Sequence, residues 1–145
     1  MPTRSARTTW TGGPQDGTGT VALVSSGIGS YEVSFPRRAA DDAGGFTSPE
    51  ELIAAAHTAC FAMQFAALLD AAGGSGQSLD VTADVSLGPD PAGGFRITGI
   101  ALAVQGSAEG VSAERFAEIA QEAKNTCPVS KALAGTTISL KVAAG

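Results

Sequence analysis

Two cysteines are the residues of this sequence best suited to covalent chemistry. Cys60 lies within a long apolar segment, and Cys127 immediately precedes Pro128. Because proline favours the first position of a helix, we expect the Cys127 thiol at a helix N-terminus, where unpaired N–H groups stabilise a thiolate. The thiolate is the nucleophilic form of cysteine, so Cys127 is a candidate nucleophile. A turn-filling role for Cys127 stays open on local sequence alone.

The surroundings of Cys60 allow two interpretations. A free cysteine on an Ala-rich helix is commonly a small core residue. His57 lies three residues earlier and shares its helix face, as in a Cys–His pair with a base-activated nucleophile. No Asn or Asp is placed to orient His57, which favours a neutral, buried histidine bonded to a carbonyl. A cysteine hydrolase is therefore the weaker alternative, and it alone requires His57 for turnover.

Three charged residues precede the apolar segment. Glu50 lies in the first turn of the predicted helix, where a carboxylate compensates the helix dipole. Arg37 and Arg38 are adjacent in a predicted exposed loop over residues 37–47, which also carries two aspartates. Exposed ion pairs of this kind contribute little energy. None of the three residues requires a functional role on local sequence alone.

The apolar segment is predicted to form one long helix over residues 49–72. Ser48 fits the N-cap, Pro49 the first helical position and Glu51 the capping-box position, and a Gly-Gly pair follows the end. Of the 18 residues between Glu51 and Asp70 only three are polar, which predicts a helix buried on nearly every face. Acidic ends, many alanines and no basic anchors disfavour a membrane span.

Short alternating runs predict strands on both sides of this helix. Those before it cover residues 18–24 and 31–35, and those after it cover 79–87, 95–104 and 138–142. A bulge at Gly99 reconciles the two halves of the strand over 95–104. Two further helices are predicted over 112–124 and 129–133. This order predicts one α+β domain over residues 1–145, with an antiparallel sheet covering the long helix.

Composition excludes several classes of function. The chain has 145 residues and a net charge of -5 without a basic cluster, so nucleic acid and anionic membranes are poor partners. Two cysteines and one histidine cannot supply the four ligands of a structural zinc site, and we expect neither a metal nor an organic cofactor. The first 13 residues lack the apolar stretch of a signal peptide, which favours a cytoplasmic protein with reduced thiols.

Two stretches of the sequence carry a family resemblance. Residues 48–63 read SPEELIAAAHTACFAM, and residues 125–133 read NTCPVSKAL. Together with the element order, they resemble the OsmC/Ohr family of bacterial thiol peroxidases over essentially the whole chain. The sequence around each cysteine is more similar to the OsmC branch of that family. The resemblance implies an OsmC-like fold, in which antiparallel sheets pack on a long buried central helix, and an intertwined homodimer.

The resemblance also implies a chemical role for each cysteine. Cys60 would reduce organic hydroperoxides, and hydrogen peroxide less efficiently, and become a sulfenic acid. Cys127 would condense with it to a disulfide, which a dithiol, a lipoylated protein in characterised relatives, would reopen. This order protects Cys60 from further oxidation. In the family a Glu and an Arg hold the first thiol ionised; Glu50 matches the Glu, and Arg38, with Arg37 as the alternative, matches the Arg.

Helix geometry connects this implied site to the dimer. Glu50 and Cys60 are ten residues apart on one predicted helix, a rise of about 15 Å. If Glu50 serves Cys60, a second chain must bring its own Glu50 alongside. We expect the apolar side chains Ile53, Phe61, Met63 and Phe65 to line the site and to favour alkyl or lipid hydroperoxides.

Two alternatives outside enzymology fit the same cysteines. One is a redox sensor or binding module whose disulfide changes its affinity for a partner. The other is a structural dimer with inert thiols. Repeated turnover in the presence of a dithiol distinguishes a peroxidase from a sensor, which reacts once, and alkylation near neutral pH identifies inert thiols.

Overall fold

The computed structural model describes residues 1–145, which divide into two compact units, Met1–Leu52 and Ile53–Gly145. The boundary falls in the first turn of helix α2 (Pro49–Ala71). Both units combine strands with helices, so the α+β class is confirmed. One domain over residues 1–145 stays a prediction.

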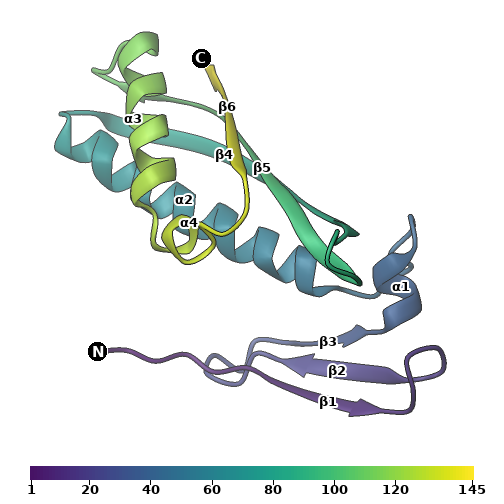
Figure 1. The fold of residues 1–145 in the computed structure, drawn as a ribbon. Helices are drawn as coiled ribbons and strands as arrows, with labels where there is room; N and C mark the ends of the chain where they lie inside the picture. The colour runs from purple at the N-terminus through teal and green to yellow at the C-terminus, as the bar shows by residue number, and fades with distance from the viewer. The chain divides into compact units, whose positions relative to one another are not determined.

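The first unit contains a three-stranded antiparallel sheet in the order β1-β2-β3 (Figure 1). Its strands are β1 (Arg7–Thr11), β2 (Thr18–Ala22) and β3 (Ser30–Val33). The alternating runs predicted β2 and β3, but β1 was missed. The sequence of β1, RTTWT, does not alternate between apolar and polar residues, and all five residues are exposed. It therefore lacks the pattern that predicts a strand.

A short helix, α1 (Phe35–Ala39), replaces the beginning of the predicted loop over residues 37–47. Ser34 is its N-cap, and the Ser34 hydroxyl accepts a hydrogen bond from the Arg37 N–H at 3.2 Å. Pro36 lies in the first turn, where its missing N–H costs nothing. The strand predicted over residues 31–35 included Ser34 and Phe35, so the N-cap at Ser34 was not recognised. Both arginines therefore lie in the last turn of a helix.

Helix α2 begins at the predicted residue and ends at Ala71, one residue before the predicted end. The Ser48 hydroxyl accepts the Glu51 N–H at 3.1 Å, although the Glu51 carboxylate accepts from the Thr47 hydroxyl and not from the Ser48 N–H. At the other end Gly73 has φ +86°, a conformation that a side chain would strain. Its N–H and that of Gly74 bond to carbonyls of the last turn at 2.9 and 2.8 Å, which is a Schellman motif.

The second unit contains a sheet in the order β4-β5-β6, formed by β4 (Ser75–Pro89), β5 (Phe95–Glu109) and β6 (Ile138–Ala144). Strands β4 and β5 form the predicted hairpin, with a register shift that leaves Thr98, next to Gly99, as the extra residue. Strand β6 runs parallel to β5, so the prediction of a purely antiparallel sheet is wrong. Helices α3 (Ala113–Thr126) and α4 (Pro128–Ala132) form the crossover that a parallel connection needs.

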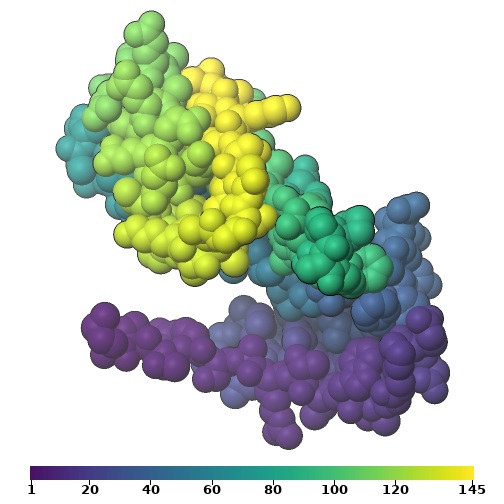
Figure 2. Space-filling model, viewed as in Figure 1, coloured from purple at the N-terminus to yellow at the C-terminus, as the bar shows by residue number.

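Helices α2 and α3 supply the side chains that cover the inner face of this sheet (Figure 1). The core combines three layers of apolar side chains: Phe61, Phe65 and Leu69 from α2; Ile100, Leu102 and Val104 from β5; and Phe116, Ile119, Ala120 and Ala123 from α3. In the space-filling view, α3, α4 and β6 form the green-to-yellow surface of the viewed face (Figure 2). Helix α2 is long and apolar enough to cross a membrane, yet its phenylalanines belong to this core.

The prediction that α2 is buried on nearly every face is wrong for the single chain. Ala55, Ala59, Met63 and Ala67, spaced four residues apart, are exposed, and Met63 retains 73% of its accessible surface. Residues at this spacing share one face of a helix. We refer to these four residues as the exposed stripe of α2. Phe61 and Phe65, which we expected to line a substrate site, are instead fully buried in the core.

Phe65 is the residue of this core with the clearest energetic role. Its ring contacts Phe61 and Phe116 at centroid distances of 5.5 and 4.7 Å, and none of its surface is exposed. We expect Phe65→Ala to lower the free energy of unfolding by about 3–5 kcal/mol, measured by chemical denaturation. Phe95→Ala is the matched control, because Phe95 is 63% exposed and should change stability by less than about 0.5 kcal/mol. Equal effects of both substitutions would contradict this core.

Candidate active site

The two cysteines lie next to each other in the second unit. Cys60, on α2, and Cys127, between α3 and α4, are 67 residues apart in sequence, and their sulfur atoms are 3.1 Å apart. Both thiols are free. Cys60 is partly exposed, whereas Cys127 is fully buried. A partly exposed sulfur can meet a substrate from solvent, and a buried sulfur beside it can react only with its neighbour.

Cys127 occupies the N-cap of α4, as the Cys-Pro sequence predicts. Its sulfur accepts a hydrogen bond from the Ser130 N–H at 3.5 Å. Burial by itself raises the pKa of Cys127, but its interactions with Cys60, with Ser130 and with the Val129 N–H outweigh burial and lower it. The contacts of the second unit therefore favour the anionic form of Cys127.

The pKa of Cys60 moves in the opposite direction. Burial raises it, and the hydrogen bond and charge of Cys127 add to that effect, while the Val129 N–H opposes it. The contacts within the second unit thus raise the pKa of Cys60 and lower that of Cys127. The family resemblance implies that Cys60 is the ionised thiol. For Cys60 to ionise first, it needs a cation from outside this unit.

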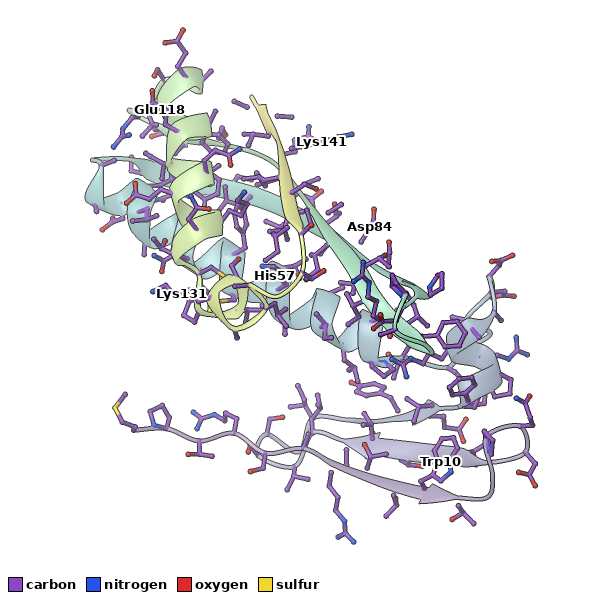
Figure 3. The ribbon with its side chains drawn as sticks, viewed as in Figure 1. Trp10, His57, Asp84, Glu118, Lys131 and Lys141 are labelled. Carbon is purple, nitrogen blue, oxygen red and sulfur yellow. The ribbon has the colours of Figure 1, made fainter.

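His57 is fully buried and contacts Ser130 (Figure 3, where His57 is labelled on α2 near α4). Its Nε2 atom is 2.7 Å from the Ser130 Oγ, and its Nδ1 atom has no partner. Burial lowers the pKa of His57, so the imidazole is neutral. The predicted neutral state is supported, but the predicted carbonyl partner is wrong. Sequence reasoning missed Ser130, although it stands in the quoted stretch after Cys127.

Arg38 and Glu50 form an ion pair in the first unit. The Nη2 atom of Arg38 is 2.7 Å from Oε1 of Glu50, and its Nε atom donates to both carboxylate oxygens at 3.0 and 3.2 Å. Burial by itself raises the pKa of Glu50, but the hydrogen bonds and charge of Arg38 outweigh it and keep the carboxylate ionised. Arg37 instead donates to the Asp42 carbonyl at 3.4 Å. Of the two candidate arginines, the structure pairs Arg38 with Glu50.

The predicted site residues therefore fall into two groups. The sulfurs of Cys60 and Cys127 belong to the second unit, and the pair of Arg38 and Glu50 belongs to the first. The structure contains no group of three His, Cys, Asp or Glu side chains that could hold a metal ion. The chemistry available from these residues is that of two adjacent thiols and a carboxylate-bound guanidinium.

Comparison with known proteins places the whole arrangement in one family. The family model of OsmC-like proteins matches residues 41–142. Peroxiredoxin OsmC of Escherichia coli K12 is 44% identical over 124 residues, which make up 86% of this chain and 85% of that protein. The Peroxiredoxin OsmC of Shigella flexneri matches with the same identity and coverage.

Solved structures agree with the sequence match. The organic hydroperoxide resistance protein OsmC of Legionella pneumophila is 26% identical, covers 99% of this chain and 98% of its own, and gives a TM-score of 0.74. An organic hydroperoxide resistance protein of Elizabethkingia anophelis is 28% identical, with a TM-score of 0.73 and coverage of 100% and 98%. The fold and both signature stretches are thus those of one family, and the chain belongs to the OsmC family.

Proposed function

We propose that this protein reduces organic hydroperoxides with Cys60 as the attacking sulfur and Cys127 as the resolving sulfur. The broader activity, that of a peroxidase, follows from 44% identity to Peroxiredoxin OsmC over most of the chain. The observation that carries the finer proposal is the 3.1 Å separation of two free sulfurs that are 67 residues apart in sequence. The difference in exposure supports the order, because a peroxide can reach Cys60 and not Cys127.

The first step oxidises Cys60. The thiolate attacks one oxygen of the hydroperoxide, the O–O bond breaks, and the alkoxide leaves and takes up a proton to become the alcohol. The sulfur carries the other oxygen as a sulfenic acid.

The second and third steps return the protein to its starting state. The Cys127 thiolate attacks the Cys60 sulfur, the S–O bond breaks, and hydroxide leaves as water after it takes up a proton. A dithiol then reduces the disulfide and is itself oxidised to a cyclic or bridged disulfide. We take a lipoylated protein as the reductant and the cytoplasm, which keeps thiols reduced, as the location.

The charge of the Arg38 guanidinium supports a role for it in ionising Cys60. Burial and Cys127 raise the pKa of Cys60, so a thiolate there needs a cation beside it. Glu50 holds Arg38 by three hydrogen bonds and fixes its direction. Glu50 and Cys60 are ten residues apart on α2, a rise of about 15 Å, so we assign the Arg38 and Glu50 at each sulfur pair to a second chain.

The exposed stripe of α2 supports the homodimer that this assignment requires. Ala55, Ala59, Met63 and Ala67 leave an apolar helix face uncovered in the single chain. Small side chains allow two helix backbones to approach closely, and two copies packed through this face would be related by a two-fold axis. Ala59 precedes Cys60 and Met63 follows it by three residues, close to one helical turn, so the same apolar contact would adjoin the sulfur and favour organic hydroperoxides over hydrogen peroxide.

A variant that cannot form the disulfide tests which sulfur reacts first. We expect Cys127→Ser, treated with one equivalent of cumene hydroperoxide, to gain one oxygen atom, and mass spectrometry to locate it at Cys60. Oxygen at another residue, or no oxidation, would contradict the assignment. The wild-type protein with excess peroxide and a dithiol should consume many equivalents per chain, whereas a sensor would consume one.

A further inference from the structure

His57 and Ser130 lie beside the sulfur pair and have no part in the steps above. His57 is completely buried, and Ser130 is 6% exposed. They come from α2 and α4, and their Nε2 and Oγ atoms are 2.7 Å apart. A polar pair buried this deeply costs desolvation energy, so the pair should do more than fill space.

The unpaired ring nitrogen fixes the direction of this hydrogen bond. A neutral imidazole carries one N–H, and the Nδ1 atom of His57 has no partner. With the hydrogen on Nδ1, a buried donor would stay unsatisfied, which is the rarer and costlier situation. With the hydrogen on Nε2, His57 donates to the Ser130 Oγ. This tautomer leaves the single hydroxyl hydrogen of Ser130 free to donate elsewhere.

Ser130 also contacts the Cys127 sulfur. Its N–H donates to that sulfur at 3.5 Å, and its hydroxyl contributes to lowering the pKa of Cys127. Ser130 also lines an open cavity of about 420 Å³, together with Lys124 and Thr136, so a cavity is the alternative direction for the hydroxyl. Because this oxygen accepts from His57, its own hydrogen is free to be donated to the sulfur.

We propose that His57 is a positioning residue for the resolving sulfur: it donates to Ser130, directs the Ser130 hydroxyl at Cys127, and thereby speeds the attack of Cys127 on oxidised Cys60. The inference rests on the proposed function, because it assigns the second step to Cys127. In that step the S–S bond forms as the S–O bond of the sulfenic acid breaks. The proton that Cys127 gives up balances the one that the leaving hydroxide takes up. A hydrogen bond to the sulfur favours the thiolate that attacks.

Few other titratable groups can perturb this sulfur. Cys60 and His57, both from α2, are the titratable groups that contact Cys127 or Ser130. Lys124 of α3 and Lys131 of α4 line the cavity beyond Ser130, and the Lys124 Nζ donates to the Ile138 carbonyl of β6 at 3.4 Å. The effect of His57 on Cys127 can therefore be measured against a constant background of charges.

The first test measures the Cys127 thiol alone. In a Cys60→Ser background, we expect Ser130→Ala and His57→Leu to raise the pKa of Cys127. The pKa is measured from the ultraviolet absorbance of the thiolate during a pH titration. Ser130→Thr keeps the hydroxyl, and His57→Gln keeps an N–H near the position of Nε2, so both should restore the lower pKa. A purely structural role would not separate these matched substitutions.

The second test measures the two oxidation steps in chains that keep both cysteines. With one equivalent of cumene hydroperoxide, we expect His57→Leu and Ser130→Ala to form the disulfide about tenfold more slowly and to change the rate of peroxide loss far less. Unchanged thiol pKa and unchanged disulfide rate in Ser130→Ala, which deletes one oxygen atom, would overturn the proposal even if His57→Leu misfolds. If no variant reacts with peroxide, the proposed function fails, and the titration still decides the role of His57.

Discussion

Replacing Cys60 by serine should abolish peroxide consumption while leaving the fold intact. A hydroxyl is far less ionised and less nucleophilic than a thiol, so the O–O bond is no longer attacked, and we expect activity to fall by at least about 10³-fold. The measurement is the loss of cumene hydroperoxide with dithiothreitol as the reductant. Cys60 is partly exposed, so the smaller oxygen atom should cost little stability.

Cys127→Ser is the matched control for this result. It removes the other sulfur of the pair, 3.1 Å away, and leaves Cys60 in place. With peroxide and no added dithiol, we expect one rapid turnover and then further oxidation of Cys60 to the sulfinic acid, because no second sulfur condenses with the sulfenic acid. If Cys60→Ser kept its turnover and Cys127→Ser lost it at the first step, the two roles would be reversed.

The helix starts show how far local sequence can predict a structure. Ser48, Ser112 and Cys127 each fit an N-cap, and α2, α3 and α4 begin directly after them. These signals are local, because a cap contacts an N–H only three residues away. The alternation in residues 138–142 likewise predicts β6, but the parallel pairing with β5 depends on the crossover through α3 and α4. Alternation contains no information about a strand's partner.

Side-chain partners across long sequence separations were the least predictable part of the site. His57 contacts Ser130, 73 residues later, and no spacing rule connects them. The family resemblance supplied the two cysteines and Glu50, but it left Arg37 and Arg38 as alternatives. The short helix α1 separates them, because successive residues of a helix point in directions about 100° apart. One arginine therefore contacts Glu50, and the other contacts the Asp42 carbonyl.

The opposite pKa directions of the two thiols bear on the role proposed for Arg38. Within one unit the hydrogen bonds favour an anionic Cys127, so the reactive form of Cys60 depends on groups that its own unit does not provide. We therefore expect the rate of the first step to depend on Arg38 more than on any other residue apart from the cysteines.

Removing the Arg38 charge should therefore slow the reaction of Cys60 with peroxide by about 10²–10³-fold, measured as kcat/KM for cumene hydroperoxide. The loss of a cation disfavours the thiolate and raises the pKa of Cys60, so Arg38→Met should recover part of its rate at higher pH. Arg37→Met is the matched control: it deletes the neighbouring guanidinium, which bonds to the Asp42 carbonyl and not to Glu50, and should change the rate little. Equal losses in the two variants would contradict a specific role for Arg38.

Mixing two inactive variants tests the proposal that Arg38 acts on Cys60 of a second chain. Chains with Arg38→Met keep Cys60, and chains with Cys60→Ser keep Arg38. If each site combines the sulfur of one chain with the guanidinium of another, a mixed dimer contains one intact site, and random exchange should restore about a quarter of the wild-type activity. Co-expression of the two chains ensures that they exchange. Absence of any recovery, in a preparation that contains mixed dimers by mass spectrometry, would place Arg38 and Cys60 of each site in the same chain.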